Sequence, residues 1–353
     1  MQKKKVVDTA KVLAIIFAFL FLIWLGLFFT KFSVKIDTYD LLYKINLINR
    51  KELKLHFIDV GQGDCAIIEL PDGKNMLVDS GEKSESVLNK IETKANKLKI
   101  KKFDYGVLTH TDSDHSGNFS RLLDSFEFGV IYMPDTLYTF DIETEAYDDF
   151  LYSTESKGIQ TEFSYEGKRI EGKGYKGNYI ITFLSPFDRD YYKLIDGEIT
   201  AEDKNGISAV LFIEYSGVSV LLTGDCIEDN EWRILDFAKA DVYSANIERV
   251  DLLKVSHHGS ASSSSYDFLS YTRPKNAIIS VGENDYSHPS NKVLSRLDKL
   301  GTKVYTTMDR GDITFTIKSN PKNAFEINCE KKAKKESDNT TLSFKLCNFI
   351  TLQ

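Results

Sequence analysis

The chain has 353 residues, of which 42% are hydrophobic and 27% are charged, and its formal net charge is −7. This composition is ordinary for a folded protein and allows a sizeable core, in one large domain or two small ones. The acidic balance excludes the strongly basic surface typical of many nucleic-acid-binding proteins, so any polyanion would have to be bound locally.

The N-terminal segment differs in composition from the rest of the chain. Residues 1–11 contain four lysines, and residues 12–30 are uncharged and rich in Leu, Ile and Phe. That length fits one membrane-spanning helix, whereas no clear small-residue cleavage pattern of a signal peptide follows. We expect a cytoplasmic basic segment at 1–11, a transmembrane anchor at 12–30 and a linker at 31–51. The positive-inside rule then predicts a single-pass protein whose main domain lies outside the cell. Lysines in the linker weaken this prediction, because they place positive charge on the outer side of the span.

Residues 52–320 alternate between short apolar strands and amphipathic helices. So many strand–helix units in one run predict a layered α/β domain. Helices are expected at 86–98, 119–125, 147–156, 228–237 and 291–300. Strands are expected at 53–58, 66–70, 75–78, 105–108, 179–184, 208–215, 218–222, 251–255, 276–280, 303–306 and 312–317.

The C-terminal segment is dominated by charge. Residues 330–338 are almost all Lys, Glu or Asp, so we expect a charged linker and tail over 321–353, with residues 340–352 compatible with an edge strand. Four cysteines do not make a disulfide framework for a domain of this size. If the domain is exported, Cys329 and Cys347 could pair, and separate free thiols are an equally good interpretation.

The densest group of potential metal ligands is His110-Thr-Asp112-Ser-Asp114-His115, which directly follows the apolar run 105–109. Imidazole nitrogens and carboxylate oxygens can together hold one or two divalent cations. Buried and unpaired, the same groups would carry a heavy desolvation cost. The sequence therefore predicts a metal site at the end of a strand.

Other ligand-type side chains also follow apolar strands, where open α/β folds gather their ligands. Asp225 is predicted to bridge two cations rather than to cap a helix. For Asp79, a turn and a supporting role beside the metals remain equally open. His257 and His258 would point to opposite sides of an extended chain, so His257 is the predicted ligand and His258 a supporting or substrate-facing residue.

Further residues are candidates for contact with substrate. His288 lies between a strand and a helix, where it could contact substrate, act as a general acid, or simply belong to a turn. Ser260 and the serines up to Ser265 offer hydroxyl and amide donors for phosphate oxygens. The lysine-rich stretches 97–102 and 168–176 could touch a phosphate backbone, although solvated surface is the preferred interpretation.

Taken together, these motifs resemble the metallo-β-lactamase superfamily. The set comprises His110-x-Asp112-x-Asp114-His115, Asp59-Val-Gly-Gln-Gly-Asp64, Leu-Thr-Gly-Asp225 and His257-His-Gly-Ser260. More narrowly, residues 52–318 are similar to the extracellular metallo-β-lactamase-like domain of ComEC-type DNA-uptake proteins. The resemblance implies a four-layer αββα sandwich with metals between the edges of the two sheets.

The resemblance also implies a ligand set. One metal would be held by His110 and Asp112 and the other by Asp114 and His115, with Asp225 bridging and His257 completing the site. Many members of the superfamily have His at the position of Asp112 and a further His before the bridging Asp, whereas this chain has no His between 115 and 257. Whether Asn205 or Ser208 compensates for the missing ligand stays open.

These observations predict a metal-dependent hydrolase. Two divalent cations would activate a water and stabilise charge on a phosphodiester, with Asp79, Asp114 and His288 as catalytic candidates. The oxygen-rich ligands favour Mn²⁺ over Zn²⁺. The leading expectation is a membrane-anchored DNA nuclease working with DNA-uptake channel proteins. Two alternatives remain, a hydrolase of a cell-surface phosphodiester or small ester, and a non-catalytic anchored binding module.

Overall fold

The computed structural model divides the chain into two units, Met1–Asn49 and Arg50–Gln353. It describes residues 52–136, 144–175, 177–187, 201–242, 244–318 and 324–332, and six residues of the first unit, Ile16, Phe17, Leu20, Phe21, Ile23 and Trp24. Among these described residues there is no helix with the length and apolar character needed to cross a membrane. The expected basic segment and linker, and most of the expected anchor at 12–30, lie outside the described residues.

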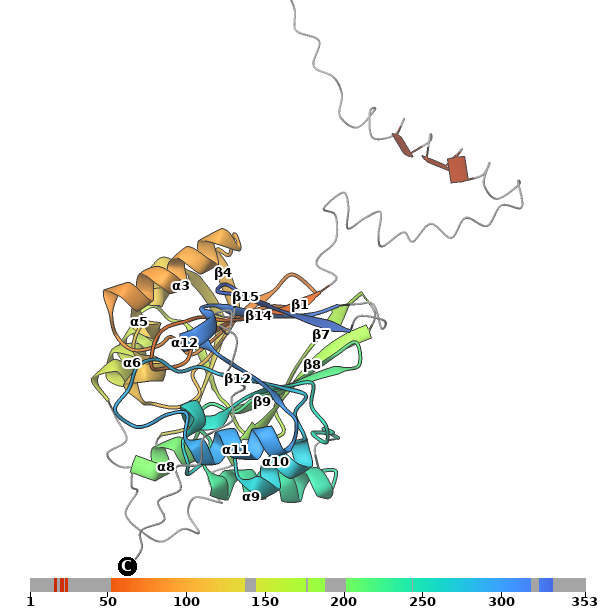
Figure 1. Ribbon diagram of the computed structural model, residues 1–353. Coiled ribbons are helices and arrows are strands. Elements are labelled where there is room, and N and C mark those ends of the chain that lie inside the picture. Colours follow the sequence, from red (N-terminus) through yellow and green to blue (C-terminus); the bar gives the residue numbers. More distant parts are fainter. Residues whose placement is uncertain are drawn as a thin grey trace, which may run out of the picture. The chain divides into compact units, whose positions relative to one another are not determined.

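The second unit is built on two β-sheets (Figure 1). The eight-stranded sheet has the order β15-β14-β1-β2-β3-β4-β5-β6, and the seven-stranded sheet has the order β13-β12-β11-β10-β9-β8-β7. The strands of the first sheet are β1 (Leu53–Phe57), β2 (Ala66–Glu69), β3 (Asn75–Val78), β4 (Lys102–Val107), β5 (Glu127–Met133), β6 (Gln160–Phe163), β14 (Ile313–Ile317) and β15 (Phe325–Cys329). Those of the second are β7 (Arg169–Gly174), β8 (Gly177–Ser185), β9 (Val210–Tyr215), β10 (Val218–Leu222), β11 (Leu252–Lys254), β12 (Asn276–Ile279) and β13 (Lys303–Thr306).

Helices cover the outer face of each sheet (Figure 1). The first sheet is covered by α3 (Glu85–Lys97), α5 (Phe119–Ser125) and α6 (Glu145–Ser156), and the second by α9 (Glu228–Lys239), α10 (Tyr266–Thr272) and α11 (Asn291–Lys299). Short elements complete the unit, namely α4 (Ser113–Ser116), α8 (Ala201–Gly206), a 3₁₀ turn (Ser256–Gly259) and α12 (Thr307–Arg310).

Three apolar clusters hold these four layers together. In β2, Ala66 and Ile68 face the second sheet, whereas Ile67 between them faces the helices, because side chains alternate along a strand. In α3, Val87 and Ile91 are four residues apart and share the buried face of the helix. The expected αββα sandwich is therefore confirmed.

The first sheet continues past the expected domain boundary at residue 320. β15 pairs antiparallel with β14, with Phe325 opposite Ile317 and Cys329 opposite Ile313. The charge run that begins at Glu330 suggested a linker, but the preceding five residues alternate between half-buried and exposed side chains, as an edge strand does. Cys329 is a free thiol here, and Cys347 lies outside the described residues, so their pairing stays a prediction.

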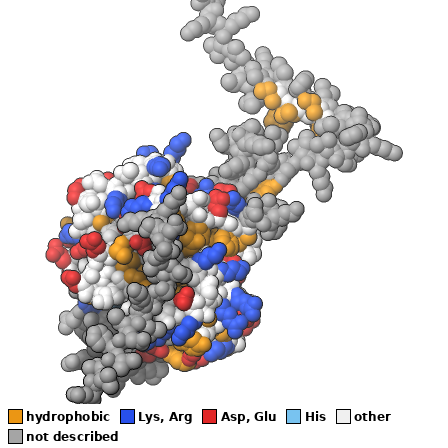
Figure 2. Space-filling view, viewed as in Figure 1, with side chains coloured by type: hydrophobic (Ala, Val, Ile, Leu, Met, Phe, Trp, Pro, Cys, Tyr) orange, Lys and Arg blue, Asp and Glu red, His pale blue; other side chains and the backbone are white. Residues whose placement is uncertain are grey.

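The parallel pairing of the central strands determines where the site lies. β3 runs parallel to β4 in one sheet, and β10, β11 and β12 run parallel to one another in the other. The residues that follow these strands therefore meet at one edge of the sandwich. Over the face drawn in Figure 2, described side chains of both charge signs occur, as expected for a chain without a strongly basic surface.

Candidate metal centre

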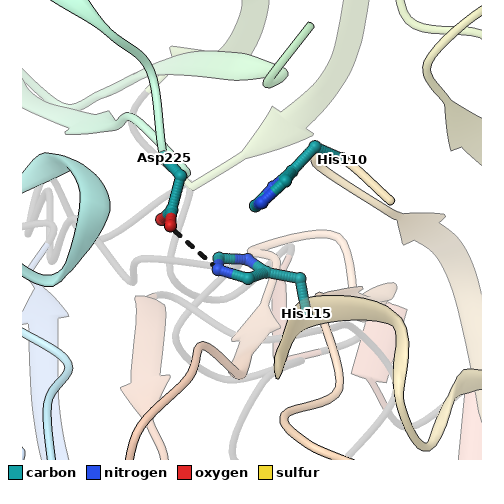
Figure 3. Close-up of side chains that lie close together, drawn as sticks. All are labelled: His110, His115 and Asp225. Carbon is teal, nitrogen blue, oxygen red and sulfur yellow. Dashed lines mark ion pairs between the residues drawn. The ribbon is translucent and has the colours of Figure 1, made fainter. Parts of the chain in front are cut away.

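Three buried atoms without a hydrogen-bond partner converge at this edge (Figure 3). They are Nε2 of His110, Nε2 of His115 and Oδ1 of Asp225, and ligand atoms of the three residues lie within 4.8 Å of one another. The Nε2 of His115 is 3.3 Å from the Oδ1 of Asp225. Buried polar atoms left unpaired are costly, and a divalent cation would satisfy all three at once. The residues present therefore fit a metal ion.

A second group shares Asp225 with the first. The Nε2 of His258 lies 3.1 Å from the Oδ2 of Asp114 and 3.4 Å from the Oδ2 of Asp225. The Nδ1 of His258 donates a hydrogen bond of 2.8 Å to the Ser280 carbonyl, so Nε2 is the ring nitrogen that faces the carboxylates. Asp225 thus directs one oxygen towards His115 and the other towards His258, the arrangement of a bridging carboxylate.

The geometry of the two adjacent histidines differs from the expectation. Both have φ of 50° in a 3₁₀ turn, so the premise of an extended chain was wrong. His258 is buried inside the cluster, whereas the side chain of His257 is 24% exposed and its Nε2 lies 3.8 Å from the Oδ2 of Asp225. The turn brings both rings to the same side and places His258, not His257, deeper in the cluster.

Asp79 holds two residues next to the cluster, Thr109 and His115, through hydrogen bonds. Its Oδ1 accepts a hydrogen bond of 2.8 Å from the Thr109 amide, and its Oδ2 accepts bonds of 2.8 Å from the Thr109 hydroxyl and from Nδ1 of His115. The helix-capping role is absent, since Ser84 caps α3. Because Nδ1 of His115 carries the proton given to Asp79, its Nε2 is free to face Asp225.

The remaining carboxylates of the motif lie at the more open side of the cluster. The Oδ2 of Asp112 is 3.6 Å from the Nε2 of His110, and the side chains of Asp112 and Asp114 are 34% and 29% exposed. The backbone of Asp114 is also in tight contact with Gly63, where a Cβ atom would lie 2.5 Å from the Asp114 carbonyl oxygen. The loop that carries Asp64 is thereby pressed against the ligand motif.

The ion pair between Asp64 and Lys254 was not predicted from the sequence. Lys254 ends the buried strand β11, and its ammonium contacts the carboxylate of Asp64, donates to the Gly224 carbonyl at 3.3 Å and lies 4.0 Å from the Oδ1 of Asp225. Lysine is almost never fully buried without a partner. A lysine inside the apolar stretch 252–255 was the signal that could have revealed the pair.

The charges within the cluster favour a cation. Burial alone lowers the pKa of His258, but Asp225 and Asp114 outweigh it and raise this pKa to about 10. Burial also opposes ionisation of Asp225, yet His258 and His115 hold the pKa of Asp225 well below its usual range. Carboxylates this strongly ionised hold protons on the neighbouring imidazoles, and a metal ion would displace those protons on binding.

Three other candidate residues lie outside the group of buried ligands, and two of them, His288 and Ser260, contact His257. The ring of His288 lies 5.5 Å from that of His257, with its Nδ1 buried and unpartnered. The Ser260 hydroxyl contacts the Ser262 hydroxyl at 3.0 Å. Asn205, in α8, has a buried Oδ1 without a hydrogen-bond partner, and the neighbouring Ser208 hydroxyl accepts from the Asp225 amide at 3.2 Å.

Two backbone amides of the serine-rich loop are engaged inside the domain. The amides of Ser264 and Ser265 donate to the carboxylate of the buried Glu231, at 2.6 and 2.8 Å. The guanidinium of Arg296 donates to the carbonyl oxygens of Ser263 and Ser264. These two amides are therefore not available as donors for phosphate oxygens.

Comparison with known proteins agrees with this architecture. The model of the metallo-beta-lactamase superfamily matches residues 58–283. The chain is 29% identical over 287 residues to ComE operon protein 3 of Bacillus subtilis, covering 76% of this chain and 33% of that protein. It is 27% identical over 307 residues to the competence protein ComA of Neisseria gonorrhoeae (87% and 38%) and 26% identical over 265 residues to recombination protein 2 of Haemophilus influenzae (72% and 28%).

The chain spans about a third of the length of these curated relatives. The expected resemblance to ComEC-type competence proteins is confirmed, and so is the superfamily. The chain belongs to the metallo-beta-lactamase superfamily.

Proposed function

We propose that the chain is a metal-dependent phosphodiesterase that cleaves DNA at a dinuclear centre. The observation that carries the proposal is the position of Asp225, whose two oxygens face two different groups of ligands. His110 and His115 lie on the side of Oδ1, and His258, which also contacts Asp114, lies on the side of Oδ2. Two cation positions joined by a carboxylate are the arrangement used by many phosphodiester-cleaving enzymes.

Bound divalent cations would activate a water and stabilise the charge that develops on a phosphodiester. The protein's own residues would set the geometry. Asp79 holds the ring of His115 through Nδ1, and the Ser280 carbonyl holds that of His258 in the same way. Carboxylates at Asp112 and Asp114 make the centre oxygen-rich, which favours Mn²⁺ over Zn²⁺ in this proposal.

His288 is proposed as a substrate contact rather than a general acid. Burial and the neighbouring His257 and His258 lower the pKa of His288, so the imidazole is neutral at neutral pH. A neutral ring cannot donate a proton as readily as an imidazolium, but it can contact or stack against a substrate.

DNA is the proposed substrate because the relatives include a competence protein and a recombination protein.

We further propose that residues 12–30 anchor the chain in the membrane, with residues 52–332 outside the cell beside DNA-uptake channel proteins. The formal net charge of −7 gives the second candidate its support, since a small ester or cell-surface phosphodiester needs no extended basic surface.

The test compares the 353-residue chain with Asp225→Asn, which removes the bridging charge, and Asp124→Asn, an exposed control. Metal content is measured by elemental analysis and cleavage on DNA with Mn²⁺, Zn²⁺ or chelator. The proposal expects metal-dependent cleavage that falls by more than about 100-fold in Asp225→Asn only. A metal-loaded chain that hydrolyses small esters but not DNA would favour the second candidate, and one inert on both would indicate a binding module.

A further inference from the structure

A series of three rings leads outward from the metal centre. His257, whose Nε2 is 3.8 Å from the Oδ2 of Asp225, has its ring edge-on to His288 with centroids 5.5 Å apart. The ring of His288 in turn stacks on Tyr286, with centroids 5.7 Å apart and an interplanar angle of 29°. Tyr286 is 72% exposed. The ring of Tyr286, the outermost of the series, is therefore exposed to solvent beside the cluster.

The loop that carries Tyr286 and His288 is held in one conformation by Asn284. The Oδ1 of Asn284 accepts hydrogen bonds of 3.0 Å from the amides of both residues. Its Nδ2 donates bonds of 2.9 Å to the carbonyls of Gly282 and His288. An exposed tyrosine on a loop this well braced loses little conformational entropy when another flat group stacks on it.

Both ends of the loop are also fastened to segments that carry the cluster. The Ser290 amide donates to the Gly259 carbonyl at 2.9 Å, beside the two adjacent histidines. At the other end, a Cβ atom on Gly282 would lie 2.5 Å from the backbone of Gly61, in the loop that leads to Asp64. Such close contacts fix the position of the Tyr286 ring relative to the metal ligands.

We propose that Tyr286, stacked on His288, is a binding platform for a nucleobase next to the phosphate that is cleaved. The inference rests on the proposed function and names the part of the substrate that the site recognises. Every base has a flat π-face, so stacking on an aromatic ring provides affinity without sequence preference. The Ser264 and Ser265 amides of the neighbouring serine loop cannot contact this base, because Glu231 accepts a hydrogen bond from each of them.

The platform distinguishes nucleic acid from other phosphodiesters. A cell-surface phosphodiester or small aliphatic ester has no flat aromatic group to place on Tyr286, whereas an exposed base of a single strand does. Bases paired and stacked within a duplex would first have to be extruded before they could reach the ring.

The experiment measures how strongly the 353-residue chain prefers a strand with bases over a strand without them. Equilibrium binding and cleavage are compared between a single-stranded oligonucleotide and a strand of the same length built of abasic residues. The variant Tyr286→Ala removes the ring, Tyr286→Phe retains it, and Tyr152→Ala removes a tyrosine that is 75% exposed on α6. The ratio of the two affinities cancels any general loss of folding or phosphate contact.

The proposal expects that Tyr286→Ala lowers this ratio of affinities by about 5- to 100-fold. In the cleavage assay, the change should appear mainly in KM. Tyr286→Phe and Tyr152→Ala should both keep the wild-type ratio. Equal ratios in the wild type and Tyr286→Ala would overturn the platform even if DNA is cleaved normally. A wild-type chain that prefers the base-containing strand but never cleaves it would contradict the proposed function and leave the platform standing.

Discussion

Lys254 and Asp64 form an ion pair at the inner side of the cluster, where β11 ends and the loop after β1 turns back. Burial by itself lowers the pKa of Lys254, but Asp64 and Asp225 outweigh it and raise this pKa, so the side chain is charged. Its ammonium therefore balances part of the negative charge of a carboxylate-rich site, next to the bridging carboxylate.

Removing this cation is expected to destabilise the fold. Lys254→Met leaves the buried Asp64 carboxylate without its lysine partner and with His115 and His258 at 3.9 Å, which costs about 3–5 kcal/mol of the free energy of unfolding. The double variant Lys254→Met/Asp64→Asn should recover most of that loss, as measured by urea unfolding. As a control, Lys157→Met, which breaks the more exposed pair with Asp124, should cost no more than about 1 kcal/mol. Additive losses in the double variant would show that the two charges are not coupled.

The hydrogen bond from His115 to Asp79 is expected to matter for metal affinity. Asp79→Asn weakens the hold on Nδ1 of His115, so that its Nε2 is less well oriented. We expect metal affinity to fall by about 10- to 100-fold, as measured by titration calorimetry. Asp124→Asn, on the surface, should bind metal as the wild type does. Unchanged affinity in Asp79→Asn would mean that the imidazole keeps its orientation without this carboxylate.

The two adjacent histidines can be separated by the same measurement. His258→Ala removes a buried nitrogen that faces two carboxylates, whereas His257→Ala removes a partly exposed one that faces Asp225 alone. Metal affinity is expected to fall by more than about 100-fold in His258→Ala and by less in His257→Ala. A larger loss of affinity in His257→Ala than in His258→Ala would support the prediction from the sequence that His257 is the metal ligand.

Stability is expected to depend on pH through Glu231. Burial raises the pKa of this carboxyl to about 7, against 4.5 for the free group, even though the amides of Ser265 and Ser264 oppose the shift. The folded state therefore binds the proton more tightly than the unfolded chain, and this contribution is lost as the pH rises from 4.5 through about 7.

The measurement is the difference in unfolding free energy between the wild type and Glu231→Gln at several pH values. From about pH 5 to about pH 8, the wild type should lose about 2–3 kcal/mol relative to the variant, which cannot titrate at this position. A difference that stays constant across this range would show that the carboxyl is ionised throughout.

Much of the fold and part of the site follow from local patterns in the sequence. The helical spacing of apolar residues predicted α3, α5 and α6 to within a few residues, because one face of each must be buried. The ligand motif 110–115 and Asp225 were predicted to meet because each follows a strand, and parallel strands end at the same edge. The sequence did not predict β5, β6, β7 and α10. β6 and β7 have few apolar residues, and β5 and α10 are short segments whose apolar residues do not by themselves distinguish a strand from a helix.

The sequence by itself determined which side chains can reach the cluster, since strand periodicity and the position of strand ends are local properties. Only the tertiary structure decided how they are used. The left-handed turn that buries His258 is adjacent to Gly259, where a Cβ atom would collide with Pro289, and the charge of Lys254 is balanced by Asp64 from the opposite sheet. Such arrangements depend on contacts between segments far apart in the chain. A local pattern can indicate that Lys254 needs a partner, but it does not indicate which residue supplies it.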